Sequence, residues 1–190
     1  MTVSELAPGL WRWTAPHPDW QEGADWEQEV GCVYYEAPGA TVLIDPLVPQ
    51  PPERERFFEA LDSDVERRGL PVSILLTVPW HGRSSAEIAE RYETTTQVPA
   101  GVEPFTLPDV EETVWWLPEH GTLVVGESLF DDGDGGLSLC PDTWVKGERR
   151  AALRRSLLPL LDLPIERVLI SHGEPVLEGG HTALERALTA

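Results

Sequence analysis

The sequence predicts an α+β fold of four layers, an αββα sandwich in which two sheets pack face to face and helices cover their outer faces. Three observations support this fold. Short β-rich runs fill the first third of the chain, helix–strand units follow, and the second half repeats this order without repeating the sequence. A chain of 190 residues has the length of one domain, so we expect residues 1–190 to form a single domain.

The first third reads as strands. Leu10–Thr14 alternates apolar and polar residues and ends at the Pro-rich segment Pro16–Pro18. Cys32–Glu36 and Ala40–Ile44 are β-rich runs on either side of Pro38 and Gly39. Turn residues between two such runs predict a β-hairpin.

Helical spacing begins after this hairpin. Pro52–Arg68 places apolar side chains at helical intervals among charges, and Gly69 marks the end of the helix. Val72–Leu76 is a continuous apolar run, typical of a strand covered on both faces. A polar loop follows, and a second helix is expected from Ser84 or Ser85 to about Tyr92.

The second half repeats this style of organisation. A solvated acidic loop is expected at Asp131–Gly136. The other predicted elements are two strands around a turn, an amphipathic helix, a strand and a final helix: Glu112–Leu117, Thr122–Val125, Glu148–Leu161, Arg167–Ile170 and Gly180–Leu188.

Composition restricts the partners. The chain carries 14 Lys and Arg against 33 Asp and Glu, a formal net charge of −19. This charge repels phosphate backbones and anionic lipids, so we expect neither nucleic acid nor a membrane as a partner. Met1–Pro8 lacks the regions of a signal peptide. Cys32 and Cys140 cannot form a disulfide framework, and we expect a reducing, cytoplasmic compartment.

Three loops follow apolar strands and immediately offer an ionisable side chain. These side chains are His81, Glu127 and His172. Loops beyond strand ends are where sites gather in layered α/β folds. Two imidazoles and a carboxylate form a ligand set for Zn²⁺ or Fe²⁺ if they converge.

Four segments, in order and spacing, resemble the metallo-β-lactamase fold. They are GATVLIDP at 39–46, ILLTVPWHGRSS at 74–85, GTLVVGESL at 121–129 and ERVLISHGEP at 166–175. The resemblance implies the αββα sandwich and, as the family's usual activity, metal-dependent hydrolysis of esters, thioesters, lactams or phosphoesters.

The sequence departs from the family's metal-binding pattern. The second segment stands where the family carries T-H-x-H-x-D-H, and either possible register leaves at most one histidine, His81. Arg83 falls in a ligand position and brings a permanent positive charge. The family's next histidine is missing, although Asp109 lies nearby in sequence. Glu127 replaces an aspartate, and only His172 matches its position outright. These departures predict a degenerate metal site.

Our leading interpretation is therefore a protein that binds a small molecule or partner in the former active-site cleft, with no metal cofactor. We expect the cleft to be built from Trp80, His81, Arg83, Glu127 and His172. Within it, Arg83 is predicted to pair with Glu127 in place of a metal. Trp20 or Trp26 is expected to roof the cleft.

The alternative is an enzyme, a mononuclear hydrolase of ester, thioester or similar bonds. One Zn or Fe ion would then be held by His81, Glu127 and His172, helped by Asp109 or His17. A structural or interaction subunit is a third possibility. The sequence leaves the catalytic residues, the ligand and the oligomeric state open.

Overall fold

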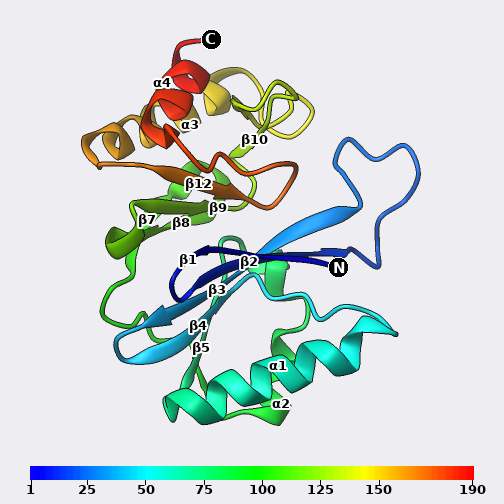
Figure 1. The fold of residues 1–190 in the computed structure, drawn as a ribbon. Coiled ribbons are helices and arrows are strands. Elements are labelled where there is room, and N and C mark those ends of the chain that lie inside the picture. Colours follow the sequence, from blue (N-terminus) through cyan, green and yellow to red (C-terminus); the bar gives the residue numbers. More distant parts are fainter.

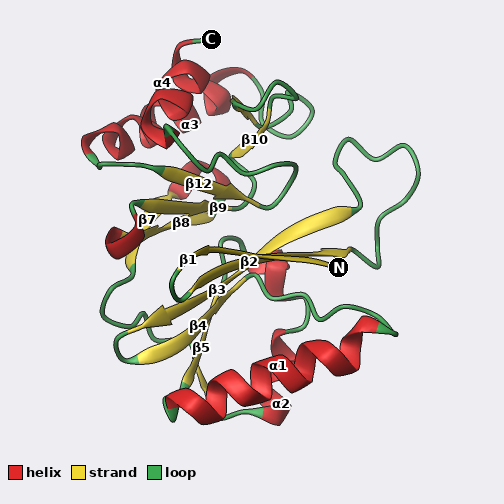
Figure 2. Cartoon of the chain, in the orientation of Figure 1, coloured by secondary structure: helices red, strands yellow, loops and turns green.

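The computed structural model describes residues 1–190 and has four layers. A six-stranded sheet and a four-stranded sheet pack face to face. Helices α1 (Glu53–Arg68) and α2 (Ser85–Arg91) cover the outer face of the first sheet, and α3 (Gly147–Leu157) and α4 (Gly180–Thr189) cover the second (Figures 1 and 2). This arrangement confirms the predicted αββα sandwich.

The first sheet begins as an antiparallel meander and ends in parallel strands. Strands β1 to β4 pair in sequence order, and β4, β5 and β6 run parallel. The strands are β1 (Thr2–Ala7), β2 (Leu10–Pro16), β3 (Glu29–Ala37), β4 (Ala40–Ile44), β5 (Val72–Leu75) and β6 (Thr94–Thr95). The β3–β4 hairpin agrees with the sequence prediction, whereas β1 was not predicted.

Helix α1 matches its sequence prediction closely. Its apolar face buries Phe58 and Leu61. Gly69 follows the last residue with a φ of 60°, and its amide bonds the carbonyl of Val65. This left-handed conformation is the usual reason for glycine at the end of a helix.

The second sheet has the order β12-β9-β8-β7. Its strands are β7 (Glu103–Leu107), β8 (Glu112–Leu117), β9 (Thr122–Val125) and β12 (Arg167–Ile170), and β12 runs parallel to β9. A separate hairpin joins β10 (Leu129–Asp131) to β11 (Leu137–Leu139). The sequence did not predict β7 or this hairpin.

Helix α3 is shorter than predicted. It ends at Leu157, and residues Leu158–Asp162 continue as a 3₁₀ helix. Pro159 explains the change, because proline lacks the amide that an α-helix needs and its ring crowds the preceding turn.

The core has a central layer between the two sheets and one layer under each helix pair. The central layer includes Tyr35 and Val42 from the first sheet and Trp115 and Leu169 from the second. The loops that follow the carboxyl ends of strands β5, β9 and β12 carry the residues of the site.

None of the helices is long and apolar enough to cross a bilayer.

Candidate metal centre

Three strand-end loops bring His81, Glu127 and His172 together. His81 lies in the 3₁₀ turn Pro79–Gly82 after β5, Glu127 follows β9, and His172 follows β12. Their ligand atoms all lie within 4.8 Å of one another. Oε1 of Glu127 lies 2.7 Å from Nε2 of His81 and 3.3 Å from Nε2 of His172. The structure thus joins residues that are about 45 positions apart in sequence.

Asp45 fixes the orientation of His81. Asp45 directly follows β4, is 2% exposed, and accepts a 2.8 Å hydrogen bond from the amide of Thr77. Its other oxygen lies 2.9 Å from Nδ1 of His81 and also accepts the Thr77 hydroxyl. With Nδ1 donating to Asp45, Nε2 faces Glu127, and loss of the Nε2 proton would free its lone pair for a metal ion. The sequence did not predict this role of Asp45.

Charges in the cluster support one another. Burial opposes the charge on His81, but hydrogen bonds to Asp45 and Glu127 outweigh it and raise its pKa. Burial also opposes the charge on Glu127, yet hydrogen bonds from His172 and His81 lower its pKa to about 2. Glu127 is therefore ionised at neutral pH, as a metal ligand must be.

Glu112 holds the turn that carries Glu127. This buried carboxylate accepts the amide of Gly126 at 2.8 Å and the amide of Glu127 at 3.2 Å. It also accepts the Ser128 hydroxyl at 3.1 Å. Burial raises the pKa of Glu112 to about 7, although these donors oppose the shift. The sequence analysis did not predict a role for Glu112. The only local indication in the sequence is that this acidic residue begins a largely apolar strand.

Aromatic packing positions His172. Its ring stacks on Phe130, with centroids 5.0 Å apart and planes 16° apart. Trp26 and Trp144 contact it edge to face at 5.3 and 5.8 Å. Its Nδ1 is buried without a hydrogen-bond partner. The loop is fixed instead by Arg12, which donates to the carbonyl of Gly173 at 2.9 Å.

The predicted ion pair between Arg83 and Glu127 is wrong. Arg83 takes a positive φ of 32° as it closes the 3₁₀ turn. Its Nη1 donates to the carbonyls of Asp45 at 3.2 Å and Gly31 at 3.4 Å. Glu127 instead pairs with the two histidines, and Arg83 is bound to main-chain carbonyls.

Asp109 does not join the cluster. It is exposed in the 3₁₀ turn Pro108–Val110, and its side chain accepts a 3.4 Å bond from Ser156. Its carbonyl accepts a bond from Arg149 of α3. The suggestion that Asp109 helps to hold a metal is therefore wrong, because these contacts hold it against α3.

The cluster opens into a cavity of about 520 Å³. All five residues expected to build the cleft line it, and Trp80 is 59% exposed. The full lining is His17, Asp19, Trp26, Trp80, His81, Arg83, Glu127, Trp144 and His172. Trp26 contributes from the β2–β3 loop as expected. Trp20 does not line the cavity, and its indole donates to the carbonyl of Trp26.

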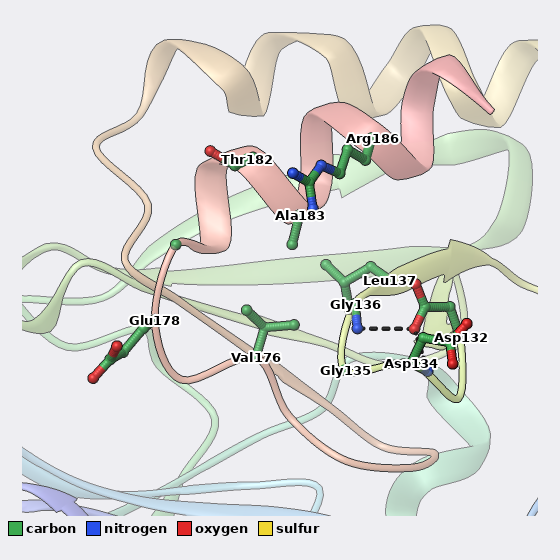
Figure 3. Close-up of a pocket in the computed structure, with 11 residues that line it drawn as sticks. Asp132, Asp134, Gly135, Gly136, Leu137, Val176, Glu178, Thr182, Ala183 and Arg186 are labelled. Carbon is green, nitrogen blue, oxygen red and sulfur yellow. Dashed lines mark hydrogen bonds between the residues drawn. The ribbon is translucent and has the colours of Figure 1, made fainter.

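A second depression of about 500 Å³ lies elsewhere, beside α4 (Figure 3). Asp132 there accepts the amides of Asp134 and Gly136, which closes the exposed acidic loop on itself. The depression shares no residue with the His81 cavity. The predicted acidic loop is thus present at residues 132–136, while Asp131 belongs to β10.

Comparison with known proteins rests on structure. Neither a protein-family model nor a curated protein matches the sequence. The metallo-β-lactamase from Erythrobacter litoralis matches with a TM-score of 0.63 and 16% identity, covering 98% of this chain and 90% of that one. The metallo-β-lactamase from Pontibacter korlensis matches with a TM-score of 0.59 and 17% identity, covering 99% of this chain and 97% of that one. The crystal structure of VMB-1 matches with a TM-score of 0.67 and 13% identity, covering 99% of this chain and 94% of that one.

These matches span nearly the whole chain, so the protein has the metallo-β-lactamase fold. The predicted resemblance is confirmed for the fold. At these identities the likeness concerns architecture, and function has to be argued from the site itself.

Proposed function

We propose that the protein is a mononuclear metal-dependent hydrolase, with one zinc or iron ion held by His81, Glu127 and His172. One observation carries the proposal: three metal-ligand side chains from three separate loops converge within 4.8 Å. This choice favours the enzyme over the metal-free binding protein that the sequence pattern alone suggested.

The residues fit a metal ion. Two histidines and one glutamate form a known catalytic zinc set that leaves a position open. Ligand atoms about 2.0–2.2 Å from one tetrahedral ion lie roughly 3.3–3.6 Å apart. The His172–Glu127 distance of 3.3 Å falls in this range. The His81–Glu127 distance of 2.7 Å is that of a direct hydrogen bond and needs to open by only about 0.6 Å.

The surroundings also suit a ligand set. Asp45 bonds the second nitrogen of His81, which is the usual partner arrangement of a metal-binding histidine. The guanidinium of Arg83 donates to main-chain carbonyls and occupies none of the three ligand atoms. The acidic side chain of Glu127 supplies the charge that a divalent ion requires.

A bound divalent ion supplies Lewis acidity for hydrolysis. The chain's own residues then have separate tasks. His81 and His172 are held by Asp45 and by aromatic packing, respectively, so both imidazoles are oriented before substrate arrives. Trp26, Trp80 and Trp144 give the cavity apolar walls against which a small molecule binds. An ester or thioester is the substrate class that we infer from the fold resemblance.

The test is the metal content of untagged protein expressed in zinc- and iron-supplemented medium, measured by elemental mass spectrometry. We expect close to one ion per chain, lost in His172→Ala and retained in His120→Ala, which removes a histidine outside the cavity. The rate of ester and thioester hydrolysis should fall when a chelator removes the ion and recover when the ion is added back. The proposal would be contradicted if the wild-type protein contains no metal and its melting temperature changes neither with added zinc nor with a chelator.

A second candidate is a metal-free protein that binds a small molecule in the same cavity. The observation in its favour is the direct His81–Glu127 hydrogen bond, which already balances the charge of the partly buried Glu127 carboxylate. The same metal measurement decides between the two candidates.

A further inference from the structure

Two side chains in the cavity stand apart from the cluster of His81, Glu127 and His172. They are Arg83 and His17. The guanidinium of Arg83 lines the cavity without a carboxylate partner, although the chain has a net charge of −19 and carries 33 acidic residues. These two residues therefore raise the question of what ligand group they bind.

Arg83 is held firmly but is not neutralised. Only its Nη1 donates within the chain, to the two main-chain carbonyls and weakly towards the sulfur of Cys32. None of the ion pairs in the structure includes Arg83. Its Nε is buried without a partner, whereas Nη2 has no hydrogen bond and is not buried. Nη2 is thus the donor that remains for a ligand.

His17 offers a second donor. Its Nδ1 accepts the amide of Asp19 at 3.2 Å, which leaves the proton of the neutral ring on Nε2. Its ring meets Trp26 edge to face at 5.3 Å. Burial, and next the charge of Arg83, lower the pKa of His17. The neutral, Nε2-protonated ring is therefore the form present at pH 7.

We propose that Arg83 and His17 bind the carboxylate of an aromatic substrate, whose ring lies against Trp26, Trp80 and Trp144. This inference rests on the proposed hydrolase and names its substrate class. The carboxylate accepts one hydrogen bond from Nη2 of Arg83 and one from Nε2 of His17. Charge-assisted bonds of this kind are the strong ones.

A carboxylate fits better than a phosphate. Arg83 brings one positive charge and His17 brings none, which matches a monoanion. Asp19 and Glu127 line the same cavity and repel a dianion more strongly. The three tryptophans offer planar apolar area, and Trp80 is 59% exposed, so it has open surface for a ring to cover.

The experiment compares 2-naphthoate with 2-naphthamide, which share one shape and differ in charge. Calorimetric titration uses protein freed of metal by chelation, so that the carboxylate cannot bind an ion. We expect wild type to bind naphthoate about tenfold more tightly than the amide. Arg83→Gln should abolish this preference. Arg155→Gln, the same charge change at an exposed position on α3, should retain it.

A second readout is the pKa of His17, followed by NMR of its ring protons and assigned with His17→Gln. Bound naphthoate should raise this pKa in wild type, because an anion beside the ring favours the charged form. It should leave the pKa unchanged in Arg83→Gln. Arg83→Lys, which keeps the charge but loses the planar fork, should lower the preference less than Arg83→Gln does.

Equal affinity for the two probes, no binding at millimolar concentration, or a preference that persists in a folded Arg83→Gln would overturn the inference. Failure of the hydrolase proposal looks different. Wild type would then lack metal after zinc supplementation, while the naphthoate preference of the metal-free protein would still be measured. Conversely, metal-loaded wild type without a naphthoate preference would refute only the carboxylate site.

Discussion

Nδ1 of His81 lies 2.9 Å from a carboxylate oxygen of Asp45, which is 2% exposed at the end of β4. This contact connects the end of a strand in the first sheet to a histidine that lines the cavity. It sets which imidazole nitrogen faces Glu127, and it does so through a residue that lines no part of the cavity.

Asp45→Asn should weaken zinc binding by about 10- to 100-fold, because a partner of this type fixes the tautomer of a metal-binding histidine. The asparagine amide places a donor opposite Nδ1 and moves the ring proton to Nε2, where the metal should bind. A competition titration with a zinc chelator measures the effect. Asp109→Asn, the same change at an exposed position, is the control. Equal affinity in both variants would contradict the role of Asp45.

Gly126→Ala should destabilise the protein by roughly 1–3 kcal/mol. A Cβ at this position would lie 2.3 Å from Oγ1 of Thr77 and 2.8 Å from its Cβ, so the Glu127 turn would have to move. Urea unfolding of the metal-free protein measures the loss. Gly39→Ala is the matched control, since a Cβ there meets nothing within 4 Å. Similar losses in the two variants would show that the turn is not tightly packed.

Glu112→Gln should remove a pH dependence of folding. The pKa of Glu112 is about 7 in the folded protein, above its ordinary value of 4.5. The folded state therefore holds the proton more tightly, and this contribution is complete below pH 4.5 and lost as the pH rises through about 7. It amounts to about 3 kcal/mol at most. Urea unfolding across this range should show a smaller fall for Glu112→Gln than for wild type. The exposed variant Glu103→Gln should retain the wild-type slope.

Phe130→Leu should lower zinc affinity without abolishing it. Leucine keeps the site apolar but loses the stacked ring that orients His172, whose Nδ1 has no hydrogen-bond partner to replace it. We expect a several-fold loss, on the scale of an aromatic pair worth about 0.5–1.5 kcal/mol. The chelator competition measures it. Phe57→Leu, outside the cavity, should leave zinc affinity unchanged.

The sequence predicts those elements whose own residues carry a clear period. The β3–β4 hairpin and helix α1 are of this kind. Strand β1 escapes prediction because it is an exposed edge strand with no buried alternation. Strands β10 and β11 have only three residues each and are defined by pairing with one another.

The site shows the same division. His81, Glu127 and His172 each follow an apolar strand, so their position along the chain indicates that they could meet. The roles of Asp45 and Glu112 depend on contacts with residues from other strands, which no local pattern encodes. The predicted Arg83–Glu127 pair failed for a related reason. It relied on a family position, while the guanidinium of Arg83 donates to the main-chain carbonyls of Gly31 and Asp45, residues of the first sheet and its strand-end loop.

The three candidate ligands do not come from one sheet. His81 follows β5 of the six-stranded sheet, whereas Glu127 and His172 follow β9 and β12 of the four-stranded sheet. A single ion bound to all three is therefore a cross-link between the two halves of the sandwich. It adds to the apolar side chains between the sheets and to the hydrogen bonds that cross between the halves, such as that from Arg12 to the carbonyl of Gly173. Its binding free energy opposes separation of the halves, so metal supply would govern the cooperativity of unfolding as well as catalysis.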